Sequence, residues 1–137
     1  MKQVDQIRTI CNLGCGTMGF STAVVFAGAG YEVRMFGRRT ASIERAMTNI
    51  KAALAGLTDN GLLSQAEAEN LRGRIRGVTT IEEAATGADF VIESVAEDIS
   101  VKQSVYAETE KYIDDDVIIA TDSSGLSPTG LSACMNL

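Results

Sequence analysis

The chain has 137 residues, of which 45% are hydrophobic and 22% charged, and its formal net charge is −6. This length fits one folded domain with a substantial core. The acidic balance argues against a nucleic-acid or anionic-membrane surface, because both depend on cationic patches. No apolar run could span a bilayer and the first residues lack a signal-like apolar segment, so we expect a cytoplasmic protein. With three cysteines and no histidine, we expect neither a metal site nor a disulfide framework.

A glycine-rich turn follows the first apolar segment, residues 7–13. Residues 14–19 read Gly-Cys-Gly-Thr-Met-Gly, and apolar residues then recur at helical spacing. Glycines at these positions allow a sharp turn from strand to helix, admit a pyrophosphate to the backbone, and let helix and strand pack closely. The start of the helix directs N–H groups at the anion. The predicted dinucleotide contacts are Gly14, Gly16, Thr17, Met18 and Gly19. A tight turn without a ligand is the alternative.

Residues 31–36 alternate as a strand does, and glycines 28 and 30 end the preceding helix. In NAD-binding folds an acidic residue at the end of this second strand binds the adenosine ribose, but here Gly37, Arg38 and Arg39 follow the strand. A glycine leaves room for a 2′-phosphate, and two guanidinium groups supply donors to it. NADP is therefore an alternative to NAD, whereas FAD and S-adenosylmethionine fit less well. Arginines that are merely exposed in a loop are the remaining alternative.

A helical hairpin follows, from an amphipathic helix over residues 40–57 and a second helix that begins near Ser64 and ends near Arg74. It is longer than a simple crossover needs, so it is a candidate surface for substrate or a partner. Arg72, Arg74 and Arg76 are expected at the helix end, where positive charge complements the helix dipole.

Further strands are predicted at residues 77–80, 90–94 and 117–120, separated by a short capped helix and by a helix over residues 101–113. A last short helix begins at Pro128. Short apolar strands between helices are typical of a parallel sheet covered on both faces. We therefore predict an α/β doubly wound (Rossmann) fold with five strands in the order 3-2-1-4-5.

Three segments resemble the NAD-binding domain of 3-hydroxyacyl-CoA dehydrogenases, over about residues 9–133. Residues 14–19 are similar to the family's Gly-x-Gly-x-Met-Gly. Residues 89–98 are similar to Asp-x-Val-Ile-Glu-Ala-Val-x-Glu, and Lys102 follows at the family's spacing. Residues 120–126, Ala-Thr-Asp-Ser-Ser-Gly-Leu, align with Ala-Ser-Asn-Thr-Ser-Ser-Leu.

The resemblance implies roles for three side chains. Glu97 and Lys102 would contact the cofactor, and Ser124 would be the active-site serine that holds the reacting oxygen near the nicotinamide. A Ser/Gly loop that caps a strand is the alternative for Ser124. The chain departs from the family at Asp122, where the family has Asn, at Gly125, where it has Ser, and at Gly37, where it has the ribose-binding acid.

The resemblance also implies an oxidoreductase that transfers hydride between a 3-hydroxyacyl-CoA, or a related 3-hydroxy acid, and NAD or NADP, in a full-length homodimer. The family's general base is a histidine about twenty residues after the serine, and these 137 residues contain no histidine. We therefore expect residues 1–137 to be one dinucleotide-binding domain, an N-terminal fragment without the catalytic histidine and the C-terminal helical domain, and inactive alone. The alternative is a stand-alone nucleotide-binding module with a sensing or structural role.

Overall fold

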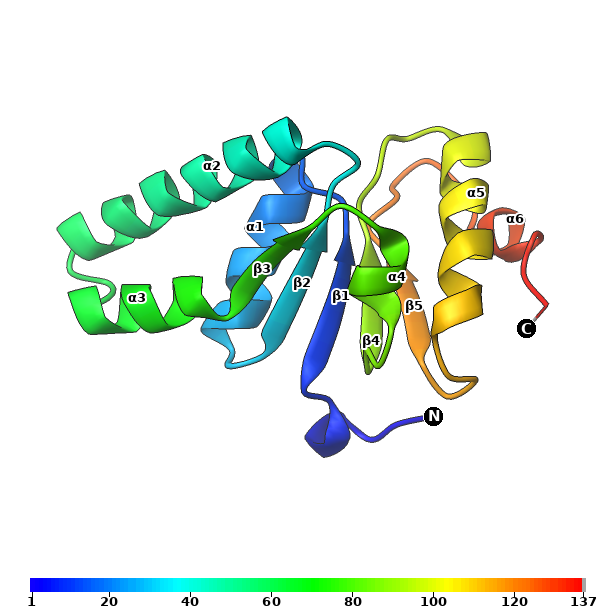
Figure 1. Cartoon of the computed structure of the whole chain (residues 1–137), viewed down its shortest axis with the longest axis horizontal. Coiled ribbons are helices and arrows are strands. Elements are labelled where there is room, and N and C mark those ends of the chain that lie inside the picture. Colours follow the sequence, from blue (N-terminus) through cyan, green and yellow to red (C-terminus); the bar gives the residue numbers. More distant parts are fainter. Residues whose placement is uncertain (137) are drawn as a thin grey trace.

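A computed structural model describes residues 1–136. Its centre is a parallel sheet of five strands in the order β3-β2-β1-β4-β5, which confirms the predicted doubly wound α/β fold (Figure 1). The strands are β1 (Thr9–Leu13), β2 (Glu32–Phe36), β3 (Ile75–Val78), β4 (Phe90–Glu93) and β5 (Ile118–Thr121).

The strands β1, β2 and β4 form the buried middle of the sheet. Residues 9–13 of β1 pair one to one with residues 32–36 of β2, and residues 10–13 also pair with residues 90–93 of β4. Four of the five β1 residues are buried, because helices cover both faces. Cys11 is one of these. Asn12 is the buried polar residue in this strand, and its role is described below.

Helices α1 (Thr17–Gly28), α2 (Thr40–Asp59) and α3 (Gln65–Gly73) cover one face of the sheet, with a core built around Val33, Met35 and Ile50. Helices α4 (Ile81–Ala85) and α5 (Ile99–Thr109) cover the other face, where Leu13 and Val91 are buried. The remaining elements are short: the 3₁₀ turns η1 (Val4–Gln6) and η2 (Glu110–Tyr112), and α6 (Pro128–Ser132).

The predicted helical hairpin is formed by α2 and α3, and it is the whole connection between β2 and β3. Figure 1 shows it extending past the edge strand β3. Ser64 caps α3 as predicted: its hydroxyl accepts a hydrogen bond from Glu67 N, and the Glu67 carboxylate accepts one from Ser64 N.

Two predicted boundaries are wrong. The third strand is Ile75–Val78 rather than residues 77–80, because Thr80 caps α4 with its hydroxyl and cannot extend the strand. Arg76 therefore lies in β3, while Arg72 and Arg74 lie at the end of α3. The long helix after β4 ends at Thr109, and Tyr112 lies in the short 3₁₀ turn that follows.

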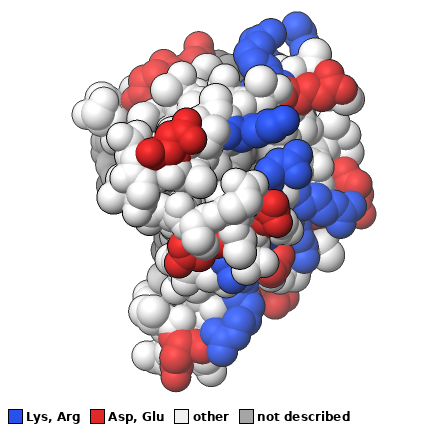
Figure 2. Space-filling model, turned by 90° about the vertical axis from the view of Figure 1, so that its left-hand side faces the viewer, with Lys and Arg blue, Asp and Glu red and all other residues white. Residues whose placement is uncertain are grey.

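Charged side chains of both signs are mixed on the face that carries the hairpin, with Lys and Arg gathered in a band along one side of it (Figure 2). Although the net charge of the chain is −6, acidic residues do not form one continuous patch on this face. Within residues 1–136, none of the helices has both the length and the hydropathy needed to cross a membrane.

Candidate functional site

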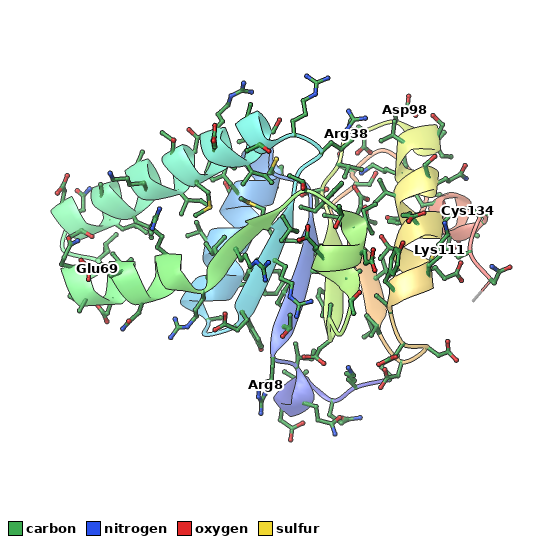
Figure 3. The ribbon with its side chains drawn as sticks, viewed as in Figure 1. Arg8, Arg38, Glu69, Asp98, Lys111 and Cys134 are labelled. Atoms are coloured by element: carbon green, nitrogen blue, oxygen red, sulfur yellow. The ribbon has the colours of Figure 1, made fainter. Side chains whose placement is uncertain are left out.

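A groove of about 610 Å³ opens at the carboxyl ends of the strands. Its walls are the turn after β1, the loop after β2, the loop after β4 and part of α5. In open sheets of this kind, ligands bind where the strand order reverses, which here is between β1 and β4. Figure 3 shows Arg38 and Asp98, the residue that caps α5, at this same end of the molecule. The predicted site residues that line the groove are Gly14, Gly16, Thr17, Met18, Gly37, Arg38 and Arg39.

The three glycines of the turn have different roles. Gly14 has φ +129°, and a Cβ on it would lie 2.8 Å from Ser94 Oγ. A Cβ on Gly19 would overlap the carbonyl oxygen of Gly14. Both are therefore required by the packing of the turn on itself and on Ser94. A Cβ on Gly16, by contrast, would meet no atom within 4 Å, and its φ of −72° suits any residue. Nothing in the protein itself requires glycine there, so the open space above Gly16 fits a ligand that approaches the backbone.

The first turn of α1 faces this space. Gly16 is the N-cap of the helix and offers no side-chain cap to its N–H groups. Thr17 and Met18 follow it, and Met18 is 58% exposed. An uncapped helix start with exposed residues around it is suited to an anion such as a pyrophosphate.

The loop after β2 brings the predicted arginines to the same groove. Gly37 is buried, and a Cβ on it would lie 2.5 Å from Cys15 Sγ and 3.1 Å from Ile43 Cγ1. Cys15 thus occupies the space into which a side chain at position 37 would extend. Arg38 and Arg39 are exposed, and Arg39 is the N-cap of the 20-residue helix α2.

A buried ion pair lies beneath the loop after β4. Glu93 and Lys102 have fully buried side chains, and Lys102 Nζ donates to Glu93 Oε1 at 2.7 Å. The second Glu93 oxygen accepts hydrogen bonds from the hydroxyls of Tyr106 at 2.9 Å and Thr121 at 2.8 Å. Lys102 Nζ also lies 3.3 Å from Glu97 Oε2. The carboxylate of Glu93 therefore joins β4, α5 and β5.

The network shifts the pKa values of Lys102, Glu97 and Tyr106. Burial alone would lower the pKa of Lys102, but the hydrogen bond and charge of Glu93, with those of Glu97, outweigh it and raise the pKa. The Glu97 carboxylate accepts a hydrogen bond from Ser123 Oγ, which with Lys102 lowers its pKa. Burial raises the pKa of Tyr106 to about 12. Lys102 is therefore a cation and Glu97 an anion at neutral pH.

The loop after β5 carries Ser124, which is exposed. The preceding Ser123 fixes this loop: its N–H donates to Thr121 Oγ1 at 3.1 Å, and its hydroxyl donates to Glu97 and accepts from Leu126 N. Burial, together with the negative charge of Glu93, raises the pKa of Asp122. The loop thus presents Ser124 and an acid of raised pKa next to the β4 loop.

Some predicted site residues do not line the groove. Gly19 lies behind Gly14, and Lys102 points into the protein toward Glu93. The side chain of Glu97 is 47% exposed but is bonded to Lys102 and Ser123. The cofactor contacts of Glu97 and Lys102 stay predictions. Within residues 1–136, no group of three or more acidic, cysteine or histidine side chains is arranged to hold a metal ion.

Sequence reasoning missed four residues that shape the groove. Ser42 and Ser94 line it, Cys15 fills its corner, and Asn12 bonds to its turn. One of these had a signal in the sequence, because a polar Asn12 interrupts an apolar strand immediately before the glycine motif.

Residues 9–136 match the family model described as the NAD-binding domain of 3-hydroxyacyl-CoA dehydrogenase. The chain belongs to this family. The match begins at the first residue of β1 and includes the glycine turn, the β4 loop and the β5 loop, so it covers every segment that forms the groove.

Relatives within and near the family share this domain. A 5-formyl-3-hydroxy-2-methylpyridine 4-carboxylate 5-dehydrogenase of Mesorhizobium japonicum is 37% identical over 127 residues, which are 93% of this chain and 40% of the relative. A probable 3-hydroxybutyryl-CoA dehydrogenase of Bacillus subtilis is 30% identical over 131 residues, 96% of this chain and 45% of the relative. The crystal structure of (S)-3-hydroxybutyryl-CoA dehydrogenase from Ralstonia eutropha has a TM-score of 0.91 at 28% identity, covering 96% of this chain and 46% of that one. This chain therefore spans less than half the length of these relatives.

Proposed function

We propose that this domain binds a nicotinamide dinucleotide with its pyrophosphate over the turn at Gly14–Gly19, as part of an oxidoreductase. The observation that carries the proposal is Gly16, which the protein leaves as glycine although a side chain would fit there without strain. The start of α1 supplies N–H groups for the phosphates. When bound, the nicotinamide supplies the hydride chemistry, and the residues of this chain bind and orient it.

Isothermal titration of the wild type and Gly16→Val with NADH tests this proposal. The valine side chain fills only the open space above the turn, so the variant should keep the thermal midpoint of the wild type and lose at least tenfold in affinity. Equal dissociation constants for the two proteins would contradict the assignment of the turn. A folded wild type that binds no dinucleotide would contradict the proposal as a whole.

We propose further that NADP binds more tightly than NAD. Gly37 and Cys15 leave no carboxylate at the ribose position, Arg38 and Arg39 line the groove, and α2 begins directly after them. Ser42, in the first turn of α2, adds a hydroxyl donor. A charge-assisted phosphate contact contributes roughly 1.5 to 3 kcal/mol, which is a preference of tenfold or more. The family's NAD-binding character is the argument for the other cofactor.

Dissociation constants for NADH and NADPH in the wild type, Arg38→Ala and Arg45→Ala separate these cases. Arg45 is an exposed arginine in α2 that does not line the groove, which makes it a matched control. Arg38→Ala should weaken NADPH and leave NADH unchanged, and added salt should reduce the NADPH preference. Equal affinities of the wild type for both cofactors would mean that Arg38 and Arg39 are surface charge.

For the reaction, we propose oxidation of a 3-hydroxyacyl-CoA or a related 3-hydroxy acid, with the Ser124 hydroxyl holding the reacting oxygen. The support is the match of the β5 loop to the family and the exposed position of Ser124 near the Glu97 loop. No histidine is present to accept the alcohol proton, and general base catalysis contributes about 10²- to 10⁴-fold. These 137 residues alone should therefore turn over 3-hydroxybutyryl-CoA at background rate. Robust turnover would point to Asp122 as the base, and Asp122→Asn would then abolish it.

The family resemblance also supports a homodimeric full-length protein in the cytoplasm. Sedimentation equilibrium of the full-length protein tests the dimer, and fractionation of the source cells tests the location. A full-length protein that is monomeric at micromolar concentration would contradict the proposed homodimer.

A further inference from the structure

Asn12 is a buried polar residue of β1 that lies between the apolar residues Cys11 and Leu13. It is 0% exposed and lies in register between Met35 of β2 and Ile92 of β4. Both of these neighbours belong to the core under α1. A buried amide in such surroundings opposes folding unless its polar atoms are hydrogen-bonded.

The amide nitrogen of Asn12 is bonded to both ends of the glycine turn. Nδ2 donates to the carbonyl oxygen of Gly14 at 2.9 Å and to that of Gly19 at 3.0 Å. Gly14 directly follows β1 and Gly19 lies in the first turn of α1, so one side chain joins the strand end to the helix start. These two acceptors also fix the orientation of the amide, because the reverse orientation would set Oδ1 against two carbonyl oxygens.

The other end of the same amide has no partner. Among the buried side-chain nitrogen and oxygen atoms of residues 1–136, Asn12 Oδ1 is the one without a hydrogen bond. A leucine has the same branched shape and would place no polar atom in this core, but it could not bond to the turn. The chain therefore carries an amide with one unbonded oxygen at the strand position from which a side chain reaches the glycine turn.

We propose that Asn12 is a positioning residue for the cofactor. Its two hydrogen bonds hold the Gly14 and Gly19 carbonyls on the side of the turn that faces the sheet, which leaves the N–H groups at the start of α1 directed into the groove. Asn12 does not touch the cofactor and acts through the backbone of the turn. The inference rests on the proposed dinucleotide binding and deepens it.

Isothermal titrations of wild type, Asn12→Leu and Cys11→Val with ADP-ribose, NADH and NADPH test the proposal. Cys11 is the matched control, because it is equally buried in β1 but belongs to the core on the opposite face of the sheet. Asn12→Leu should fold with a lower thermal midpoint than the wild type, because it removes the donor of two buried hydrogen bonds together with the unbonded oxygen. It should bind all three ligands at least tenfold more weakly, because they share the pyrophosphate, with the ratio between NADPH and NADH unchanged. Cys11→Val should stay within twofold of the wild type for each ligand.

A folded Asn12→Leu that binds the three ligands with wild-type affinity overturns the proposal. If Asn12→Leu does not fold, Asn12→Ala is measured in the same way, with the same expected loss and the same contrary result. If the wild type binds none of the ligands, the proposed dinucleotide binding is wrong. The role of Asn12 is then tested by hydrogen exchange of the ligand-free proteins. The backbone amides of residues 16–20 should exchange faster in the variant while those of β4 do not change. Equal exchange of residues 16–20 in variant and wild type overturns the proposal.

Discussion

Cys15 and Gly37 come from different strand ends, and their side-chain volumes are coupled. A Cβ at position 37 would lie 2.5 Å from Cys15 Sγ, so the acidic side chain that the family resemblance implies at the end of β2 would need the space that Cys15 occupies. Burial raises the pKa of the Cys15 thiol, so it is a neutral filler at pH 7. We therefore expect the choice between NAD and NADP to depend on both residues and not on position 37 alone.

The first prediction concerns this pair. Gly37→Asp alone should destabilise the protein by about 1 to 3 kcal/mol, the range for overpacking a buried position. Gly37→Asp together with Cys15→Ala should recover most of this loss and also shift the preference toward NADH, because the carboxylate can then reach the ribose diol. Urea unfolding and titration with both cofactors measure the two effects. Cys15→Ala alone is the control and should bind both cofactors as the wild type does. If the effects of the two substitutions on stability were additive, the two positions would be independent and the coupling would be contradicted.

At the scale of elements, the carboxylate of Glu93 joins three elements next to the groove, β4, α5 and β5. Glu93 ends β4, Lys102 and Tyr106 project from α5, and Thr121 ends β5. Lys102, Tyr106 and Thr121 bond to Glu93 from other elements. The fourth partner lies in the loop after β4, where Val95 N donates to Glu93 Oε1 at 2.7 Å. The loops that carry Glu97 and Ser124 are therefore held by a charge pair inside the protein.

The second prediction is that Lys102→Met destabilises the protein by about 3 to 5 kcal/mol at pH 7, because it leaves Glu93 as a buried charge without a countercharge. Urea unfolding at pH 7 measures this loss. Lys51→Met, at an exposed position of α2, should change stability by less than about 0.5 kcal/mol. If Lys102→Met changed stability by as little as Lys51→Met, the remaining hydrogen bonds of Glu93 would be sufficient to stabilise its carboxylate without the cation.

At the scale of the whole molecule, Asp89 fastens the N-terminal segment to the end of the sheet opposite the groove. Its carboxylate accepts hydrogen bonds from Lys2 Nζ at 2.7 Å, Arg8 N at 2.8 Å and Thr9 N at 2.9 Å. Burial alone would raise the pKa of Asp89, but these bonds outweigh it and lower the pKa to about 2. The segment before β1 is therefore held by an acid that stays charged well below neutral pH.

The third prediction follows from the sign of that shift. Because the folded-state pKa is lowered, the stabilisation is present above about pH 4, near the unfolded value, and is lost as pH falls through about 2. Asp89→Asn should lower the free energy of unfolding by roughly 1 to 2 kcal/mol at pH 7. The difference from wild type should shrink as pH falls below about 4 and be lost below about pH 2. Urea midpoints at about pH 7, 4, 2.5 and 1.5 measure it. Glu44→Gln, at an exposed position of α2, is the control, and a pH-independent effect of Asp89→Asn would contradict the charge argument.

The sequence by itself determined the strand order, the glycine turn, the capped starts of α3 and α4 and the family. These depend on local signals: apolar runs, glycines at fixed spacing, and Ser64 or Thr80 placed three residues before a glutamate. Such signals depend only on residues that are close together along the chain, so they can be read without knowledge of the tertiary structure.

Only the tertiary structure decided that packing does not require the glycine at position 16, that Cys15 fills the space beside Gly37, and that Lys102 is buried against Glu93. It also showed that Asn12 bonds to the turn. Each of these is a contact or an open space between segments that come together when the sheet forms. Residue type and spacing do not fix such distances, because they depend on how the helices pack on the two faces of the sheet.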